Sequence, residues 1–284
     1  MKKILFLLGI VVLFASCGEY NKILKSTDYE LKYTYAKKYF NEKKYGRSIT
    51  LLEELVPIFR GTSNAEESLF LLAQSFYYDK DYMSASQYYT TYYTTYPRGE
   101  FAELARYNSA YGMYLNSPEV KLDQSSTYRA IQEFQNFLEY YPQSDKVQFA
   151  QEYMFELQEK LAYKEYLAAK LYYNLGNYMG NNYDACVVTA REAMKSYPFS
   201  KLIEEFQILI LKARFDLAVN SIDERKPLRY RDVIDEHFNY LNMFPSGKYM
   251  KESKNYYKKS LEYLGEELLE EEPLAKTELN NIER

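Results

Sequence analysis

Apolar and polar residues follow a helical pattern along almost the whole chain. From residue 18 onward, large apolar side chains recur every three or four positions, which is the spacing of one face of an α-helix. Proline ends these runs regularly, because it cannot continue a helix and pushes the residue before it into an extended conformation. The closing pairs are Tyr96-Pro97, Tyr141-Pro142, Tyr197-Pro198 and Phe244-Pro245. The pattern therefore predicts a chain of helices separated by short turns.

Within these runs, large and small side chains follow the order of a tetratricopeptide repeat, a two-helix unit of about 34 residues. In the clearest unit, Ala73 and Ala85 stand where two helices approach closely, and aromatic residues fill the space between repeats. We expect an all-α fold, a right-handed α-solenoid of about five tetratricopeptide-like helix pairs, with an insertion over residues 116–126. A single long helical bundle would give a similar periodicity, but the regular prolines argue against it.

The first residues have the features of a bacterial lipoprotein signal. A charged start and an apolar run too short to cross a bilayer lead to small residues and then Cys17. We expect residues 1–16 to be removed and Cys17 to receive a lipid anchor, followed by a linker over residues 17–29. An ordinary secretory signal before a cysteine is the alternative. Gly18 after the cysteine favours the outer membrane, and a single Glu19 favours a protein that faces the periplasm.

Composition argues against several classes of function. The net charge of −4 and the pI near 5.4 disfavour a nucleic-acid binder, which needs a cationic face. One histidine and two cysteines are too few for the common His or Cys metal sites, and no glycine-rich phosphate loop is present. The single histidine, His237, falls at a packing position, and Cys186 lies in an apolar stretch. We therefore expect a protein that is not an enzyme and that has no metal or cofactor.

The C-terminal part divides into a basic helix and an acidic end. We expect N-terminal repeats over residues 30–143, C-terminal repeats over residues 144–264, and a flexible acidic tail over residues 265–284. Lysines gather just before this tail, and they form either a solvated helix face or a docking surface for a partner or anionic lipids. The candidate docking lysines are Lys251, Lys254 and Lys258.

The fourth unit contains the run at 161–173 with its paired tyrosines, then residues 176–178, and the closing Pro198. With the lipoprotein signal and the repeats, these residues resemble the BamD family, the lipoprotein subunits of the machine that assembles β-barrels in the outer membrane. Thr189 stands where the family uses an arginine to contact the barrel subunit, and Arg191 lies two residues away. The spacing before Pro198 is also about five residues longer than in enteric members. Arg191 is therefore only a candidate docking residue.

The resemblance implies a role without chemistry. It implies a groove along the first helix of each N-terminal repeat that receives an extended segment of an unfolded outer-membrane protein, and C-terminal repeats that dock on the periplasmic POTRA domains of a BamA-like barrel. Aromatic and amide groups in the groove suit a segment that ends in an aromatic residue and a carboxylate, with Lys37 as the charge partner. The expected groove residues are Glu30, Tyr33, Lys37, Phe40, Asn41, Glu67, Phe70, Gln74, Tyr77 and Tyr78.

Two other functions remain open at this stage. A tetratricopeptide lipoprotein could act as a scaffold in envelope or cell-wall maintenance without a BamA-like partner. A nutrient-uptake lipoprotein could share the helical framework, but the modest length and the absence of tryptophan disfavour glycan binding.

Overall fold

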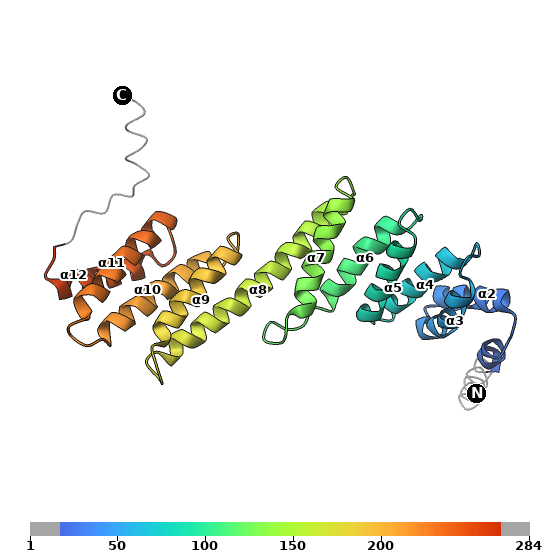
Figure 1. Ribbon diagram of the computed structural model, residues 1–284, viewed down its shortest axis with the longest axis horizontal. Helices are drawn as coiled ribbons and strands as arrows, with labels where there is room; N and C mark the ends of the chain where they lie inside the picture. Colours follow the sequence, from blue (N-terminus) through green and yellow to red (C-terminus); the bar gives the residue numbers. More distant parts are fainter. Residues whose placement is uncertain (1–17, 268–284) are drawn as a thin grey trace, which may run out of the picture. The chain divides into compact units, whose positions relative to one another are not determined.

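The computed structural model describes residues 18–267, and this part of the chain is helical without strands (Figure 1). The expected all-α repeat fold is confirmed, because successive helices pack against each other in pairs. The pairs are α2 (Tyr29–Asn41) with α3 (Tyr45–Ile58), α4 (Ala65–Tyr78) with α5 (Tyr82–Thr95), α6 (Ala102–Leu115) with α7 (Ser125–Tyr140), α8 (Val147–Leu175) with α9 (Asn182–Ser196), and α10 (Ile203–Val219) with α11 (Lys226–Met243). A single helix, α12 (Met250–Leu264), follows the fifth pair.

The chain divides into two compact units, and the division falls inside α8, between Leu157 and Gln158. The division falls inside this helix because α8 is long, with 29 residues. The expected boundary between N-terminal and C-terminal repeats, at residues 143 and 144, stays a prediction. Ala150 and Leu157 belong to a core that also contains Phe134 of α7, whereas the second half of the helix contributes Ala169 to the core around α9 and α10.

A glutamate on the first helix of each pair holds the segment that follows the second helix. Glu66 accepts hydrogen bonds from the Tyr92 hydroxyl and, at 2.9 Å, from the backbone N–H of Glu100. These bonds join helices and turns that are far apart in sequence, so each glutamate ties its own repeat to the beginning of the next one. The other contacts of this kind are Glu30 with Asn64, Glu103 with Ser144, Glu159 with Lys201, and Glu204 with Tyr240 and Tyr249.

The residues before the first repeat are part of the folded unit. Residues 18–24 are helical, Ile23 is buried, and the ring of Tyr20 packs edge-on against Tyr39 at 5.7 Å. The expected linker over residues 17–29 is therefore a short packed helix followed by a turn, because apolar side chains at its end reach the core of the first repeat.

At the other end, Gly265 closes α12 in the left-handed conformation (φ 69°) that glycine adopts without strain. Glu266 then forms an ion pair with Arg231 at 2.9 Å. The rest of the expected acidic tail lies outside the described residues, as do the signal peptide and Cys17. Among residues 18–267, none of the helices combines the length and the apolar character that crossing a membrane requires.

Candidate peptide-binding surface

A pocket of about 350 Å³ opens between the first helices of the second and third repeats. Both helices contribute tyrosines and one amide each, and the turn before α8 adds a lysine. The lining therefore combines aromatic rings, amide groups and a single cation, all within the first unit. Its residues are Gln74, Tyr77, Tyr78, Tyr89, Leu104, Tyr107, Asn108, Tyr111 and Lys146.

The pocket lies within a continuous strip of aromatic rings that crosses four helices. Tyr77 of α4 contacts Tyr111 of α6 at 6.4 Å between ring centres, and Tyr111 contacts Tyr153 of α8 at 4.9 Å. On the other side, Phe40 of α2 packs against Tyr78 at 5.8 Å. We call these rings the aromatic strip; its members are Phe40, Tyr77, Tyr78, Tyr107, Tyr111, Tyr114 and Tyr153.

Four phenols of the strip, those of Tyr77, Tyr107, Tyr111 and Tyr114, have a raised pKa and remain uncharged at neutral pH. Burial raises the pKa of Tyr77, Tyr107 and Tyr111. The pKa of Tyr114 rises to about 12, mainly because its hydroxyl donates to the Glu156 carboxylate at 2.5 Å. A protonated phenol both donates and accepts hydrogen bonds, so the strip offers apolar area together with polar tips.

Lys146 supplies the positive charge at the pocket. Its Nζ lies 6.0 Å from the ring centre of Tyr107 and 2.9 Å from a carboxylate oxygen of Asp145. Asp145 is 82% exposed, so this ion pair is weak and an incoming carboxylate can compete with it.

Five of the expected groove residues lie in or beside the strip. Gln74, Tyr77 and Tyr78 line the pocket, and half-buried Phe40 packs against Tyr78. Asn41, at the end of α2, is exposed beside this group. The helical register of the first two repeats therefore brings Gln74, Tyr77 and Tyr78 together at the pocket, and their binding of a peptide stays a prediction.

Three other expected residues are placed differently. Tyr33 and Phe70 are buried rather than open to a ligand, because Phe59 packs edge-on against Tyr33 at 5.3 Å and Phe101 stacks on Phe70 at 4.4 Å. Lys37 does not line the pocket; its Nζ lies 4.2 Å from the Tyr33 ring centre and 3.6 Å from Glu67.

The remaining two expected residues, Glu30 and Glu67, are exposed but are engaged inside the repeat array. Glu30 accepts a hydrogen bond from the Asn64 amide at 3.1 Å, and Glu67 is the ion-pair partner of Lys37. Both carboxylates therefore connect the first repeat to the second, and neither belongs to the pocket.

The sequence reasoning missed the contribution of the third and fourth repeats. Tyr107, Tyr111 and Tyr114 occupy the positions on α6 that Phe70, Gln74 and Tyr77 occupy on α4, as the aligned alanines Ala73 and Ala110 indicate. Extending the groove register into α6 would have found them. Lys146 has no such signal, since it lies in a turn.

The family model that matches this chain is YfiO, described as an outer membrane lipoprotein, and the match covers residues 26–198. This is more than half of the 284 residues. The chain belongs to the YfiO family. Its pocket and aromatic strip lie wholly inside the matched region, whereas α10, α11 and α12 lie beyond it. Among curated proteins, no significant relative is found.

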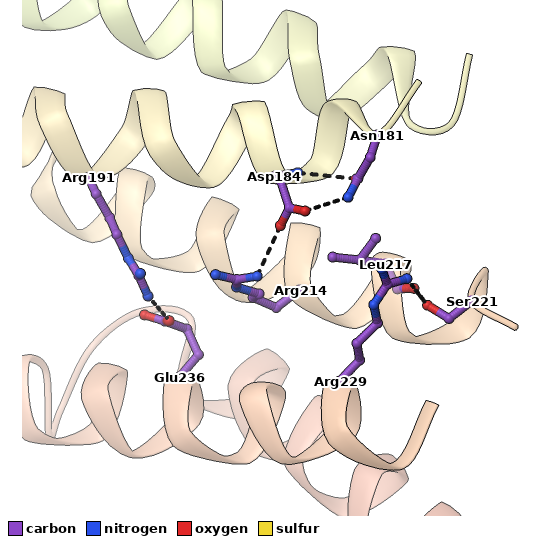
Figure 2. A network of polar contacts seen from close by, with 8 residues as sticks. All are labelled: Asn181, Asp184, Arg191, Arg214, Leu217, Ser221, Arg229 and Glu236. Carbon is purple, nitrogen blue, oxygen red and sulfur yellow. Dashed lines mark hydrogen bonds and ion pairs between the residues drawn. The ribbon is translucent and has the colours of Figure 1, made fainter. Parts of the chain in front are cut away.

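Arg191, the candidate docking arginine of this YfiO member, is occupied within the second unit. It reaches from α9 to Glu236 on α11, where the nitrogen and oxygen are 2.6 Å apart (Figure 2). The Glu236 side chain is 5% exposed and also accepts from Gln207 at 2.6 Å. Arg191 therefore neutralises a buried carboxylate. This role in the fold accounts for the arginine even if no partner protein contacts it.

The candidate docking lysines share one face of α12. Lys251, Lys254 and Lys258 are exposed, and Tyr257 on the opposite face is fully buried. Two lysines close to this face are used internally: Lys248 pairs with Glu205, and Lys212 pairs with Glu252. The exposed face is basic, as the sequence indicates.

The residues considered for chemistry are packed into the second unit. His237 is fully buried, lies 2.7 Å from the Ser253 hydroxyl and stacks on Tyr257. Cys186 is also fully buried, and burial raises the pKa of its thiol to about 12. In residues 18–267, His, Cys, Asp and Glu form no group suited to a metal ion.

Proposed function

We propose that this chain is the BamD subunit of an outer-membrane β-barrel assembly machine, a lipoprotein that binds unfolded clients and does no chemistry. The observation that supports this most directly is the family match, because the YfiO family is the BamD family. The pocket and the aromatic strip supply the binding surface for an extended client segment in this proposal, since neighbouring rings and amides can contact both side chains and backbone.

The pocket chemistry favours a segment that ends in an aromatic residue and a free carboxylate. An aromatic side chain gains edge-on or stacked contacts with Tyr77, Tyr107 and Tyr111. Gln74 and Asn108 can hydrogen-bond the peptide backbone, and Lys146 can pair with the terminal carboxylate. This assigns the charge partner to Lys146 in place of Lys37, because Lys146 lines the pocket.

Peptide binding tests this assignment. A fluorescent peptide of about ten residues with a free C-terminal phenylalanine should bind the wild-type chain in an anisotropy titration. The double variant Tyr77→Ala with Lys146→Ala should weaken this binding at least about tenfold. That is the loss expected for one charge-assisted hydrogen bond and one ring contact. Lys37→Ala is the matched control and should leave the affinity unchanged. Equal affinities for the wild type and the double variant would exclude the pocket as the client site.

The second unit would dock on the POTRA domains of a BamA-like barrel, and Cys17 would anchor the chain in the outer membrane with the repeats in the periplasm. The lipobox at Cys17 and the family of outer membrane lipoproteins support this location. Lys251, Lys254 and Lys258 of α12 are exposed and form a basic face on the second unit.

Capture of the tagged chain from detergent-solubilised envelopes tests the assembly role. A POTRA-containing barrel recovered in a near-equal amount is the expected result. If peptidoglycan-associated proteins or a nutrient-uptake barrel were recovered instead, the fold and family would stand and the proposed function would not.

A further inference from the structure

The turn between α8 and α9 differs from the rest of the surface in composition. Residues 171–183, which we call the α8–α9 tip, contain no Asp, Glu, Lys or Arg in a chain that is 27% charged. They include four tyrosines, two leucines and a methionine, together with asparagines and glycines. The corresponding turns of the other repeats are charged, with Glu42, Lys43 and Lys44; Asp79, Lys80 and Asp81; Glu119, Lys121 and Asp123; and Asp223, Glu224 and Arg225.

Five large apolar side chains of the tip are exposed to solvent, whereas Tyr173 and Tyr183 are half-buried and pack on the core of the second unit. Met179 is 91% exposed, Tyr178 69% and Leu171 58%, while Tyr172 and Leu175 are more than one-third exposed. Soluble proteins rarely expose several large apolar side chains together. Such a group on one projecting turn therefore indicates an interaction site.

The backbone of the tip is built to hold these side chains outward. Asn182 donates from its backbone to the Gly176 carbonyl at 2.9 Å and from its side chain to the Tyr178 carbonyl at 2.8 Å. Met179 has a left-handed backbone (φ 54°), which glycine or asparagine adopts at a lower cost than methionine. The turn thus satisfies the carbonyl groups of Gly176 and Tyr178 with its own hydrogen bonds, and it presents the Met179 side chain from a strained backbone position.

We propose that the α8–α9 tip inserts into the headgroup region of a lipid bilayer. Tyrosines with leucine and methionine, without charge, match the composition of protein segments at membrane interfaces, where a ring sits in the apolar layer and its hydroxyl stays hydrated. Lys170, exposed at the base of the tip, can extend its charged end toward the headgroups. Membership of an outer membrane lipoprotein family puts the chain at such a surface.

This inference rests on the family and the exposed tip, and not on client binding or POTRA docking. Because the tip has no cation within it, insertion is driven by apolar area and not by attraction to anionic lipids. It should therefore change little with salt or with the fraction of anionic lipid, unlike binding through the lysines of α12.

Depth-dependent fluorescence quenching tests the proposal in the full chain. The protein is purified from membranes and reconstituted into vesicles of phosphatidylethanolamine and phosphatidylglycerol. An environment-sensitive label is placed at Met179→Cys, and at Met83→Cys as the matched control, a methionine that is 64% exposed beside a charged turn. The native thiol of Cys186 is fully buried and stays unlabelled.

The label at position 179 should be quenched by spin-labelled lipids and protected from iodide, whereas the label at position 83 should show the reverse. If iodide quenches the label at position 179 as strongly as the label at position 83, the tip does not enter the bilayer and the proposal fails. A tip that binds a protein partner instead of lipid would give this same result.

Vesicle flotation of the full chain with Cys17→Ser gives a second measurement without the proposed anchor. Tyr178→Asn with Met179→Asn should lower the lipid partition coefficient at least about tenfold, the effect of losing two large apolar side chains. Both substitutions are at exposed positions, and asparagine suits the left-handed backbone, so the fold is retained. An unchanged coefficient, or binding that disappears in high salt, would overturn the proposal.

Discussion

Replacement of Arg191 by alanine separates a role in the fold from a role in docking. The Glu236 carboxylate beneath Arg191 is 5% exposed, and the substitution leaves it with the hydrogen bond from the Gln207 amide. Breaking a fully buried ion pair costs about 3–5 kcal/mol, because one charge stays buried without compensation. The Arg191 side chain is 47% exposed, so water screens the pair, and we reduce the expected cost to about 1–2 kcal/mol.

This cost is measurable in thermal unfolding followed by circular dichroism. For a unit of roughly 100 residues, a loss of 1 kcal/mol lowers Tm by about 4–8 °C, so Arg191→Ala should lower the Tm of the second unit by about 5–15 °C. Lys195→Ala is the matched control on the same helix, since its ion pair with Glu192 is exposed on both sides. The control should change Tm by less than about 3 °C, because exposed pairs contribute little.

A double variant identifies the cause of the loss. Arg191→Ala with Glu236→Gln removes the buried charge and should recover a large part of the lost stability. The reasoning is refuted if Arg191→Ala unfolds like the wild type, and a variant of normal stability that no longer captures a POTRA-containing barrel would return Arg191 to the docking surface.

Three further predictions concern the packing of the repeats. Glu66→Ala removes the acceptor of the Tyr92 hydroxyl and should destabilise the first unit by about 1–3 kcal/mol in urea unfolding, while Glu67→Ala should have little effect. Gly112→Ala should destabilise by about 1–3 kcal/mol, since a Cβ there meets the backbone of α5 at 3.2 Å; an unchanged midpoint would contradict that contact. Cys186 should not react with a thiol reagent at pH 8 until the chain unfolds, because its raised pKa keeps the thiol protonated and burial blocks access.

The repeat architecture was readable from the sequence because it is periodic. The closing Tyr96-Pro97 pair and the alanines Ala73 and Ala85 predicted the helices of the second repeat, and with them Gln74, Tyr77 and Tyr78 at the pocket. The sequence prediction placed Tyr33 and Phe70 on the open surface, and it was wrong because residues at the helix ends cover them. Phe59 and Phe101 lie just outside the ends of α3 and α6, and they cover Tyr33 and Phe70 and remove them from the surface.

The boundary between the units could not be predicted for a related reason. The helix α8 runs through residues 147–175 without a break, so its sequence marks no division. The separation depends on which neighbours each half packs against, and those contacts are long-range. Lys146 was missed in the same way, because its position in the pocket depends on a turn that folds beside α6.

The 34 tyrosines of the chain fall into groups with different physical roles, and single hydroxyl deletions can separate them. The Tyr92 hydroxyl donates to Glu66 and accepts from the backbone N–H of Phe101 at 3.1 Å, so it holds two repeats together. The Tyr77 hydroxyl makes no hydrogen bond within residues 18–267, and its ring lines the pocket. The first tyrosine belongs to the fold, and the second is available to a ligand.

Phenylalanine substitutions should therefore have opposite effects at the two positions. Tyr92→Phe should lower the unfolding free energy by about 1–2 kcal/mol through the unsatisfied partners that it leaves, and should keep the affinity for an aromatic-ended peptide within about twofold. Tyr77→Phe should unfold like the wild type and should weaken the peptide severalfold, because only the bound state uses that hydroxyl. If both substitutions changed stability and binding in parallel, fold and recognition would share the same tyrosines, and the division drawn from their hydrogen bonds would be wrong.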